Sequence, residues 1–579
     1  MSTDAAVDRR LFAAFLLVAA VFLFLGLGQR DLWAPDEPRY AQVAEELRSM
    51  QHGMSGLVLL HLNGEVYTQK PPLYFWLAAL AGAPSDRVTE TAARLPSAAA
   101  GFFAVMLTTI LGARLVGARA ALCGAALLLT SNVFADNARR AQLDALLTLF
   151  ETLALFAFWR LDRGVGRRVT NILLLHGSLG LGVLTKGPVG LLIPLFVIAG
   201  FLLWERRLSA LRHALPLWSL PLSLGPGLLW ITAAVTFAPA GYFGEAVFEN
   251  LIGRFFEGTS HKRPFYYFLY QLPLEFMPWS LLLPLVYRIS RGQVFRPNGD
   301  PSRKRVWRFL LSWVGVSLLF FSCSSGKRGI YLLPSFPALA LLCAQSVECY
   351  LRDRRSPARI PHQAAPAIAH LRDMATRSGT KCGLPAGFHT AAGILGLSCL
   401  GAGIFFLVQP HWGNITIPSV FCIVLLAVAI GGTALWEFLR RSSSQPMTLF
   451  SVLIAALLVI ELNVFALFYP ALDGEKSPRP IAQAAVAAAP PDTPIGLVSD
   501  HAFVGGLRYY SGRPIAELHS KKSIRQFLAR GGRAMVVKER KLSRITAITP
   551  ADVQFRGRSG RRTIVVVTPR LSQEPPRIP

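Results

Sequence analysis

Long apolar stretches recur along the whole chain and constrain its fold more than any other feature. Many of them approach the ~20 residues that an α-helix needs to cross ~30 Å of lipid hydrocarbon. Only 16% of the 579 residues are charged and 52% are hydrophobic, whereas soluble domains carry about 25% charged residues. We therefore predict a polytopic α-helical membrane protein.

The apolar runs give about thirteen candidate transmembrane helices of roughly 16–24 residues each. The first run follows Arg9 and Arg10 and has no small-residue cleavage site after it, so we expect it to be retained as a helix. The candidate spans are 11–28, 95–113, 120–135, 143–160, 169–184, 187–204, 214–237, 271–287, 307–322, 329–347, 391–408, 416–438 and 447–469.

Basic residues in alternate connections orient the chain. With a cytoplasmic N-terminus, the inside connections at 160–168, 206–212, 288–308 and 351–390 are rich in arginine and lysine. Short cytoplasmic loops carry such an excess in membrane proteins. An odd number of spans then puts the C-terminus outside. The same bias accounts for the net charge of +27, so we expect no nucleic-acid partner.

Three larger pieces lie on the outside in this orientation. We predict a transmembrane catalytic domain over 1–470, with outside loops at 29–94 and 238–270, and a small α/β domain over 471–579. In the first loop, the segment Arg39–Leu47 reads as a short amphipathic helix at the membrane interface, preceded by the start signal Asp36-Glu37-Pro38. The α/β prediction rests on strand-like runs at Ile495–Val498, Met535–Val537 and Thr563–Val567 and a helical run at Lys522–Ala529.

Ionisable residues gather at the outside ends of the predicted spans. A charge at membrane depth costs at least ~2.5 kcal/mol, so each cluster needs an explanation. The clusters are Pro35–Tyr40, Tyr67–Tyr74, Arg139–Asp144, Thr185–Pro188, His261–Tyr267 and Ser325–Tyr331.

Each cluster also has a purely structural explanation. Asp36 could cap a helix, and Lys70 could extend to lipid headgroups. Asp144 could pair with Arg139 or Arg140, and the tyrosines near His261 could form an interfacial belt. Together, however, the clusters put a carboxylate, several cations and tyrosines on one side of the membrane, which suits an anionic, phosphate-bearing substrate.

Seven motifs, in order over roughly residues 30–340, resemble those of the lipid A aminoarabinose transferase and protein O-mannosyltransferase family. Members of this family use polyprenyl-phosphate sugars, and the closer match is the bacterial aminoarabinose branch. The motifs are Pro35–Tyr40, Tyr67-x-x-Lys70-Pro71-Pro72-Leu73, Ala93–Pro96, Arg140-x-x-Leu143-Asp144, Thr185–Pro188, His261 with Pro264, and Lys327-x-x-x-Tyr331-x-x-Pro334.

The resemblance implies a GT-C glycosyltransferase fold and assigns roles to particular residues. Asp36 looks like the catalytic aspartate, and Lys70 and Tyr331 look like ligands of the polyprenyl phosphate. The implied catalytic group is Asp36, Glu37, Arg39, Asp144 and Lys186, and the implied substrate-binding group is Tyr67, Lys70, Arg140, Lys327 and Tyr331.

A divalent metal ion is implied by the family pattern, with His261 as one ligand. The family has a glutamate before the lysine of the second motif, where this chain has Gln69. A neutral amide is a much poorer ligand for a divalent cation than a carboxylate. This departure argues against a metal in this protein.

The resemblance thus predicts an enzyme of the bacterial inner membrane with its active site on the periplasmic face. It would move a sugar from undecaprenyl phosphate to lipid A, as in aminoarabinose transfer. The runner-up is an enzyme that transfers mannose or a similar sugar to protein. A lipid or solute transporter would place its unusual charges at mid-span rather than at span ends, and a non-catalytic scaffold would not account for the motif series.

Overall fold

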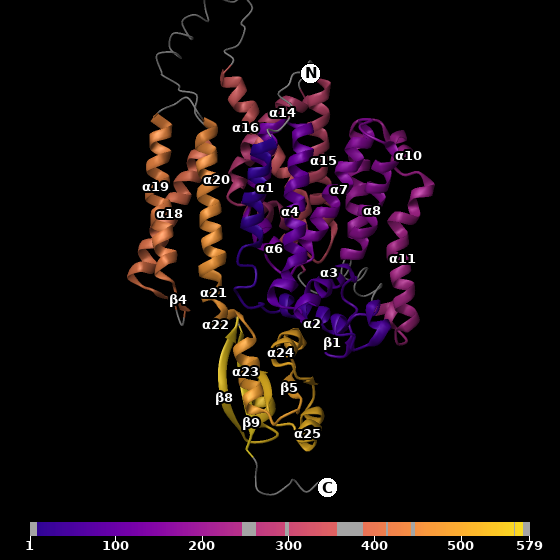
Figure 1. Cartoon of the computed structure of the whole chain (residues 1–579), viewed down its shortest axis with the longest axis vertical. Coiled ribbons are helices and arrows are strands. Elements are labelled where there is room, and N and C mark those ends of the chain that lie inside the picture. Colours follow the sequence, from indigo (N-terminus) through magenta and orange to yellow (C-terminus); the bar gives the residue numbers. More distant parts are fainter. Residues whose placement is uncertain are drawn as a thin grey trace, which may run out of the picture.

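A bundle of long, roughly parallel helices forms most of the molecule, and a small sheet lies at one end of it (Figure 1). The structure, a computed structural model, describes residues 9–245, 262–295, 300–355, 386–412, 415–441, 446–560 and 562–570. The bundle contains α1 (Arg9–Phe24), α4 (Glu90–Leu115), α5 (Ala118–Leu129), α6 (Asn132–Ala138), α7 (Asp144–Asp162), α8 (Arg168–Lys186), α9 (Val189–Trp204), α11 (Leu220–Phe237), α13 (Tyr267–Glu275), α14 (Leu283–Phe295), α15 (Pro301–Cys323), α16 (Phe336–Arg355), α18 (Ala386–Val408), α19 (Ser419–Arg441) and α20 (Pro446–Asn463).

Every predicted span overlaps one or more of these helices, but two are interrupted. The 120–135 run is split into α5 and α6, which are bent by 69°. The 271–287 run, predicted as one span, is divided between α13 and α14, with a 3-10 turn at Trp279–Leu282. Pro278 lies in that break, where a proline cannot donate a helical hydrogen bond.

Length and apolarity single out fewer spans than the sequence predicted. Among the described residues, six helices are long and apolar enough to cross a membrane, or seven if α5 and α6 together form one broken span. Four shorter apolar helices, Leu73–Ser85, Val189–Trp204, Ala392–Val408 and Ser419–Thr433, come in addition. The chain is a multi-pass membrane protein, while the number thirteen stays a prediction.

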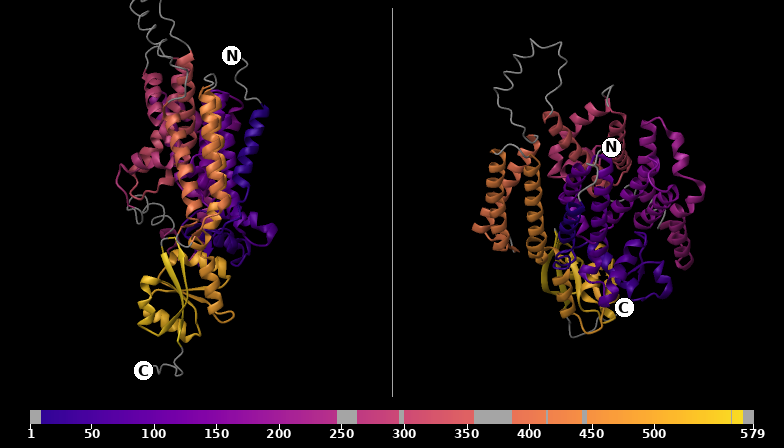
Figure 2. Two further views of the ribbon diagram at one scale, coloured as in Figure 1. Left: turned by 90° about the vertical axis from the view of Figure 1, so that its left-hand side faces the viewer. Right: turned by 45° about the horizontal axis from the view of Figure 1, so that its top comes forward.

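The helix ends show where one of the basic connections lies relative to the C-terminal sheet, while the orientation across the membrane stays a prediction. The start of α1 and the short helix α10 (Leu211–Ala214) lie at the end of the bundle away from the sheet (Figure 1). The basic residues Arg206, Arg207 and Arg212 flank or belong to α10. The left view of Figure 2 shows the sheet at the opposite end. The basic connection around α10 and the C-terminal sheet therefore lie at opposite ends of the bundle.

The C-terminal part contains a five-stranded mixed sheet in the order β6-β5-β7-β9-β8. Strand β5 runs parallel to its neighbours β6 and β7, and β9 runs antiparallel to β7 and β8. The strands predicted near 495, 535 and 563 are present, and two further strands were missed. The elements are α23 (Arg479–Ala488), β5 (Ile495–Val498), α24 (Val504–Ser511), β6 (Ile515–Leu518), α25 (Lys521–Ala529), β7 (Met535–Lys538), β8 (Ala551–Ser559) and β9 (Arg562–Pro569).

The first outside loop forms a compact layer between the bundle and the sheet. It contains α2 (Asp36–Arg48), a hairpin of β1 (His61–Leu62) and β2 (Glu65–Val66), and α3 (Leu73–Gly82). We predicted α2 as an amphipathic helix lying along the membrane surface. Instead, α2 packs against α3 on one side and α24 on another, and ten of its thirteen residues are buried. Its polar residues are therefore enclosed by protein.

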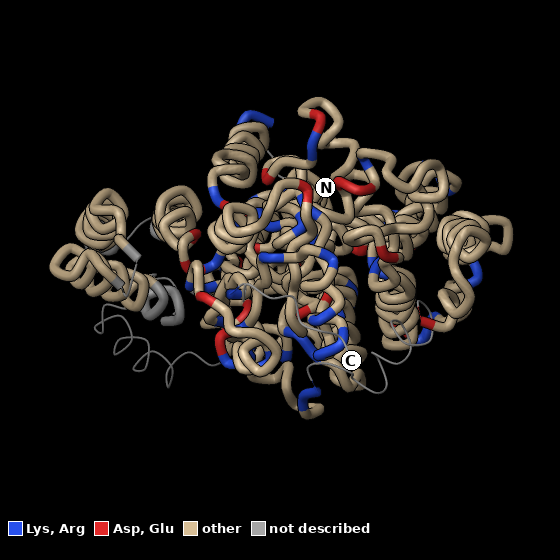
Figure 3. The backbone as a smooth tube through the Cα atoms, turned by 90° about the horizontal axis from the view of Figure 1, so that it is seen from below, with Lys and Arg blue, Asp and Glu red and all other residues tan. Residues whose placement is uncertain are grey.

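Charge is concentrated near the centre of this end of the molecule. Seen from the side of the sheet (Figure 3), lysine, arginine, aspartate and glutamate interleave across the middle, whereas the outlying pair α18 and α19 is almost wholly uncharged along its described length. Apolar helices at the periphery suit contact with lipid, and central charges need protein partners.

Candidate active site

Asp36 begins α2 and faces two arginines. Its carboxylate forms an ion pair with Arg39, one turn further along the same helix, and another with Arg328 at 3.6 Å. The start of α2 shows no side-chain capping hydrogen bond, and its cap position is Pro35. Helix capping, the structural alternative for Asp36, therefore does not describe its contacts.

Asp144 and Lys186 form a second ion pair beside the first. Asp144 is the first residue of α7, where a carboxylate complements the helix dipole. Lys186 is the last residue of α8, which ends there because Gly187 adopts a φ of +75°. Their side chains are in direct contact, and the Lys186 ammonium lies 4.7 Å from the centre of the Tyr331 ring. The expected pairing of Asp144 with Arg139 or Arg140 was wrong.

Arg328 joins the two ion pairs into one site. It immediately precedes the 3-10 helix Gly329–Ser335, which packs on α7 and carries Tyr331. The Arg328 guanidinium interacts electrostatically with Asp36, Asp144, Tyr331 and Tyr40. Burial opposes its charge, but the two carboxylates raise the pKa of Arg328 above its usual value. The site thus holds a permanent cation between its two acidic residues.

Tyrosines close the same site from the first loop. Tyr40 and Tyr67 are buried, and both interact electrostatically with Arg39. Burial and the neighbouring Asp36 carboxylate raise the pKa of Tyr40 well above its usual value. Tyr40 therefore stays neutral and can donate a hydrogen bond. Sequence reasoning missed Tyr40 and Arg328 as site residues, although both lie inside motifs that it had identified.

Lys70 lies on the stretch that joins β2 to α3, three residues after Tyr67. It is half-buried, and Pro71 and Pro72 follow it directly before α3 begins. Of the predicted site residues, the structure thus gathers Asp36, Arg39, Tyr67, Asp144, Lys186 and Tyr331 by their mutual interactions. The role of Lys70 as a phosphate ligand stays a prediction.

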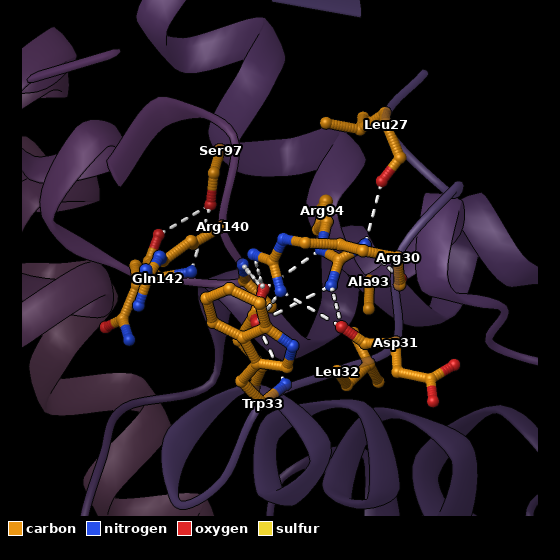
Figure 4. A network of polar contacts seen from close by, with 12 residues as sticks. Leu27, Arg30, Asp31, Leu32, Trp33, Ala93, Arg94, Ser97, Arg140 and Gln142 are labelled. Atoms are coloured by element: carbon orange, nitrogen blue, oxygen red, sulfur yellow. Dashed lines mark hydrogen bonds and ion pairs between the residues drawn. The ribbon is translucent and has the colours of Figure 1, made fainter. Parts of the chain in front are cut away.

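Glu37 lies in a different environment from its neighbour Asp36, because successive helix residues point about 100° apart. Its carboxylate accepts hydrogen bonds from Arg30 at 2.7 Å and Arg94 at 2.9 Å, and from the backbone N–H groups of Trp33 and Ala141 (Figure 4). Burial works against its charge, yet the two arginines hold the pKa of Glu37 well below its usual value. These contacts indicate a structural role.

Arg140 and Lys327 also have contacts of their own outside the Asp36 group. Arg140 pairs with Asp136 at 2.9 Å and lies 5.3 Å from the Trp33 ring centre, on the side of the Glu37 network. The Lys327 ammonium donates hydrogen bonds to the backbone carbonyls of Ser324 and Arg263. Their roles in substrate binding stay predictions.

The predicted metal site finds little support in the described part of the chain. His261 lies outside the described residues, and Gln69 is a half-buried neutral amide. Within the described ranges, no three His, Cys, Asp or Glu side chains come together as a metal site. The neutral amide of Gln69 is a poor ligand for a divalent cation, and we derive no chemical step from one.

Replacing Lys186 by methionine is expected to lower activity at least about 100-fold. The change leaves the Asp144 carboxylate without its cation. Removing one partner of a buried ion pair leaves the other charge uncompensated, which is strongly unfavourable. It also removes a positively charged group from the site, and preorganised cations of this kind stabilise negative charge in active sites. Initial rates of the purified protein in detergent would measure the loss. The control is Lys521→Met, because Lys521 is an exposed residue of α25.

Comparisons with known proteins agree with the motifs. Residues 9–239 match the family model described as dolichyl-phosphate-mannose-protein mannosyltransferase. The chain is 31% identical to the undecaprenyl phosphate-alpha-4-amino-4-deoxy-L-arabinose arabinosyl transferase of Pseudomonas savastanoi over 60% of this chain and 62% of that protein. It is 32% identical to the enzyme of the same name from Aeromonas hydrophila over 58% of this chain and 60% of that one. The matched region thus spans about three-fifths of each relative.

The fold extends over the whole chain. The crystal structure of ArnT from Cupriavidus metallidurans bound to undecaprenyl phosphate superposes with a TM-score of 0.71, at 20% identity, covering 97% of this chain and 98% of that one. The predicted GT-C architecture with a C-terminal strand-containing part is thereby confirmed, and so is the resemblance to the family that the motifs indicated.

Proposed function

We propose that this protein transfers a sugar from an undecaprenyl-phosphate donor to lipid A at the periplasmic face of the bacterial inner membrane, as in aminoarabinose transfer. The observation that carries the proposal is the meeting of Asp36, Arg328, Asp144, Lys186 and Tyr331, from four separate segments, at the end of the bundle next to the sheet. The relatives named as aminoarabinose transferases support this substrate pair.

The leaving group of the proposed reaction is a lipid phosphate, whose negative charge grows as the glycosidic bond breaks. Preorganised cations and hydrogen-bond donors stabilise such charge most effectively when water is excluded. Lys186 and Arg328 supply the cations within the gathered site, Lys70 is the further cation implied by the motifs, and the Tyr331 hydroxyl can donate a hydrogen bond.

Asp36 would act on the sugar side of the bond. Departure of the phosphate leaves positive, oxocarbenium-like character on the anomeric carbon, and a nearby carboxylate stabilises it. If the acceptor is a lipid A phosphate, it is already ionised near neutral pH and needs no base. Asp36 then orients the sugar, with Arg39 and Arg328 fixing its carboxylate.

The two-part organisation predicted from the sequence belongs to the same proposal. Residues 1–470 would form the transmembrane catalytic domain, with its outside loops at 29–94 and 238–270, and 471–579 the periplasmic domain. The position of the sheet at the end of the bundle opposite the start of α1 supports this division (Figure 1).

Mass spectrometry of lipid A tests the function. Cells that express the protein in a background without aminoarabinose transfer should gain lipid A heavier by one aminoarabinose per modified phosphate. Cells with Asp36→Asn should not. An unmodified lipid A together with newly glycosylated protein would instead support the protein-acceptor alternative, and no change in either would contradict transferase activity.

Chelation of divalent metals is expected to leave the activity of the purified protein unchanged. Gln69 replaces the carboxylate that would hold the metal, and an amide binds divalent cations poorly. Initial rates with and without EDTA would measure this. A loss of activity restored by a divalent cation would contradict the expectation and would bring His261 back as a ligand.

A further inference from the structure

The C-terminal part touches the catalytic turn of α2 backbone to backbone. Helix α24 packs against α2 through Gly505, and the neighbouring Gly506 lies against Pro38 and Pro478. A Cβ atom placed on Gly505 would lie 2.5 Å from Arg39 Cα, 2.8 Å from Arg39 Cβ and 3.1 Å from the Arg39 backbone nitrogen. No side chain fits at this position unless one helix moves.

The obstacle that a side chain at Gly505 would meet is main chain rather than a flexible side-chain end. Since Arg39 Cα and N belong to the first turns of α2, a displaced contact would move the turn that also begins with Asp36. The Asp36–Arg39 ion pair would stay intact, because both residues belong to α2 and would move together. The Asp36–Arg328 pair, 3.6 Å long, joins α2 to another segment and would open.

Further hydrogen bonds on either side of α24 hold the C-terminal part against the first loop, so they oppose a movement of α24 away from α2. Asp473 accepts hydrogen bonds from the Trp33 indole at 2.7 Å and from the Asp31 backbone at 2.9 Å. The Asn63 side chain exchanges two hydrogen bonds with the backbone of Ile515, of 2.8 and 2.9 Å. The position of α24 over α2 is thus fixed from two directions.

We propose that Gly505 is a positioning residue. Because it has no side chain, α24 can pack closely against the first turn of α2, and this close packing sets the distance between Asp36 and Arg328. The C-terminal part is then a component of the catalytic geometry. This inference rests on the proposed function, because it assigns Gly505 a role in sugar transfer.

Gly505→Ala tests the proposal against Gly474→Ala. Gly474 lies in the same part of the chain and a Cβ there meets open space. In the Gly505 variant we expect kcat to fall about 10- to 100-fold, since misplacing a catalytic group by about 1 Å can cost 10²-fold. The KM for the undecaprenyl donor should stay near that of the unmodified protein, and the melting temperature should fall only by the few degrees that local overpacking costs. Gly474→Ala should match the unmodified protein in kcat, KM and melting temperature.

Equal kcat values for Gly505→Ala and Gly474→Ala, with the unmodified protein active, would overturn the positioning role while leaving the proposed function intact. So would a loss that follows the melting temperature alone. An unmodified protein that transfers no sugar would refute the proposed function itself.

Asn63→Gly provides a second route if Gly505→Ala does not fold. Glycine accepts the positive φ of +58° at this position and removes both hydrogen bonds to Ile515, far from Gly505 in the sequence. We expect kcat to fall while the donor KM is kept. An unchanged kcat would count against a catalytic role of the docked C-terminal part.

Discussion

Replacing Asp36 by asparagine is expected to reduce sugar transfer by about 10³-fold or more, while the protein still folds and binds its donor. Removing one preorganised electrostatic group from an active site costs about 10²–10³-fold in rate, and here the carboxylate also holds Arg39 and Arg328 in place. The amide keeps the size of the side chain but not its charge. Initial rates at saturating donor would measure the change.

Asp86→Asn is the matched control for this variant. Asp86 belongs to the same loop, its side chain is 98% exposed, and among the described residues it pairs only with Arg48. Exposed pairs contribute about 0–1 kcal/mol, so activity and stability should hardly change. If Asp36→Asn keeps more than about a tenth of the original rate, Asp36 is not the catalytic aspartate.

Replacing Glu37 by glutamine is expected to destabilise the protein by about 3–5 kcal/mol, which is the usual result of removing one partner from a buried ion pair. Arg30 and Arg94 would remain buried without a compensating charge. The effect should appear as a lower melting temperature and lower yield. The rate per folded molecule should fall far less than in Asp36→Asn, because Glu37 pairs with Arg30 and Arg94, which are labelled in Figure 4, and not with residues of the gathered site.

The difference in stability between the unmodified protein and Glu37→Gln should depend on pH, because the pKa of Glu37 is lowered in the folded state. A carboxyl with a depressed folded-state pKa stabilises the folded state fully above its unfolded value of about 4.3. The gain is lost as the pH falls through the folded-state pKa. The stability difference between the two proteins should therefore stay constant from neutral pH down to about pH 5 and shrink in stronger acid.

Glu65→Gln serves as the control, because Glu65 is exposed on the hairpin of the same loop. It should melt with the unmodified protein. A Glu37→Gln variant that keeps its melting temperature but loses transfer activity would show that Glu37 acts in catalysis, as the family resemblance implied.

Much of the fold was predictable from local sequence. The spacing and length of the apolar runs indicate membrane helices because a buried backbone in lipid must satisfy its own hydrogen bonds. The strands at Ile495–Val498 and Met535–Lys538 are short apolar runs and were found for the same local reason, whereas β8, with its many exposed residues, has no such run and was missed.

The motifs also located the site residues along the chain, but their partners were decided in three dimensions. Asp144 was expected to pair with an arginine close in sequence and instead pairs with Lys186, which follows it by 42 positions. Asp36 and Glu37 are adjacent in the chain and lie in separate networks. Neither outcome is encoded in spacing alone, because it depends on which faces of α2, α7 and α8 turn toward each other.

The amino-acid sequence was sufficient for the membrane class, the small C-terminal sheet and the family resemblance. These properties depend on composition, on the spacing of apolar residues and on short motifs, all of which involve residues close together in the sequence. The tertiary structure decided that Arg328 bridges the two acidic residues and that Gly505 lies on Arg39. Such contacts join segments more than 180 positions apart, and only the packing of whole helices brings them together.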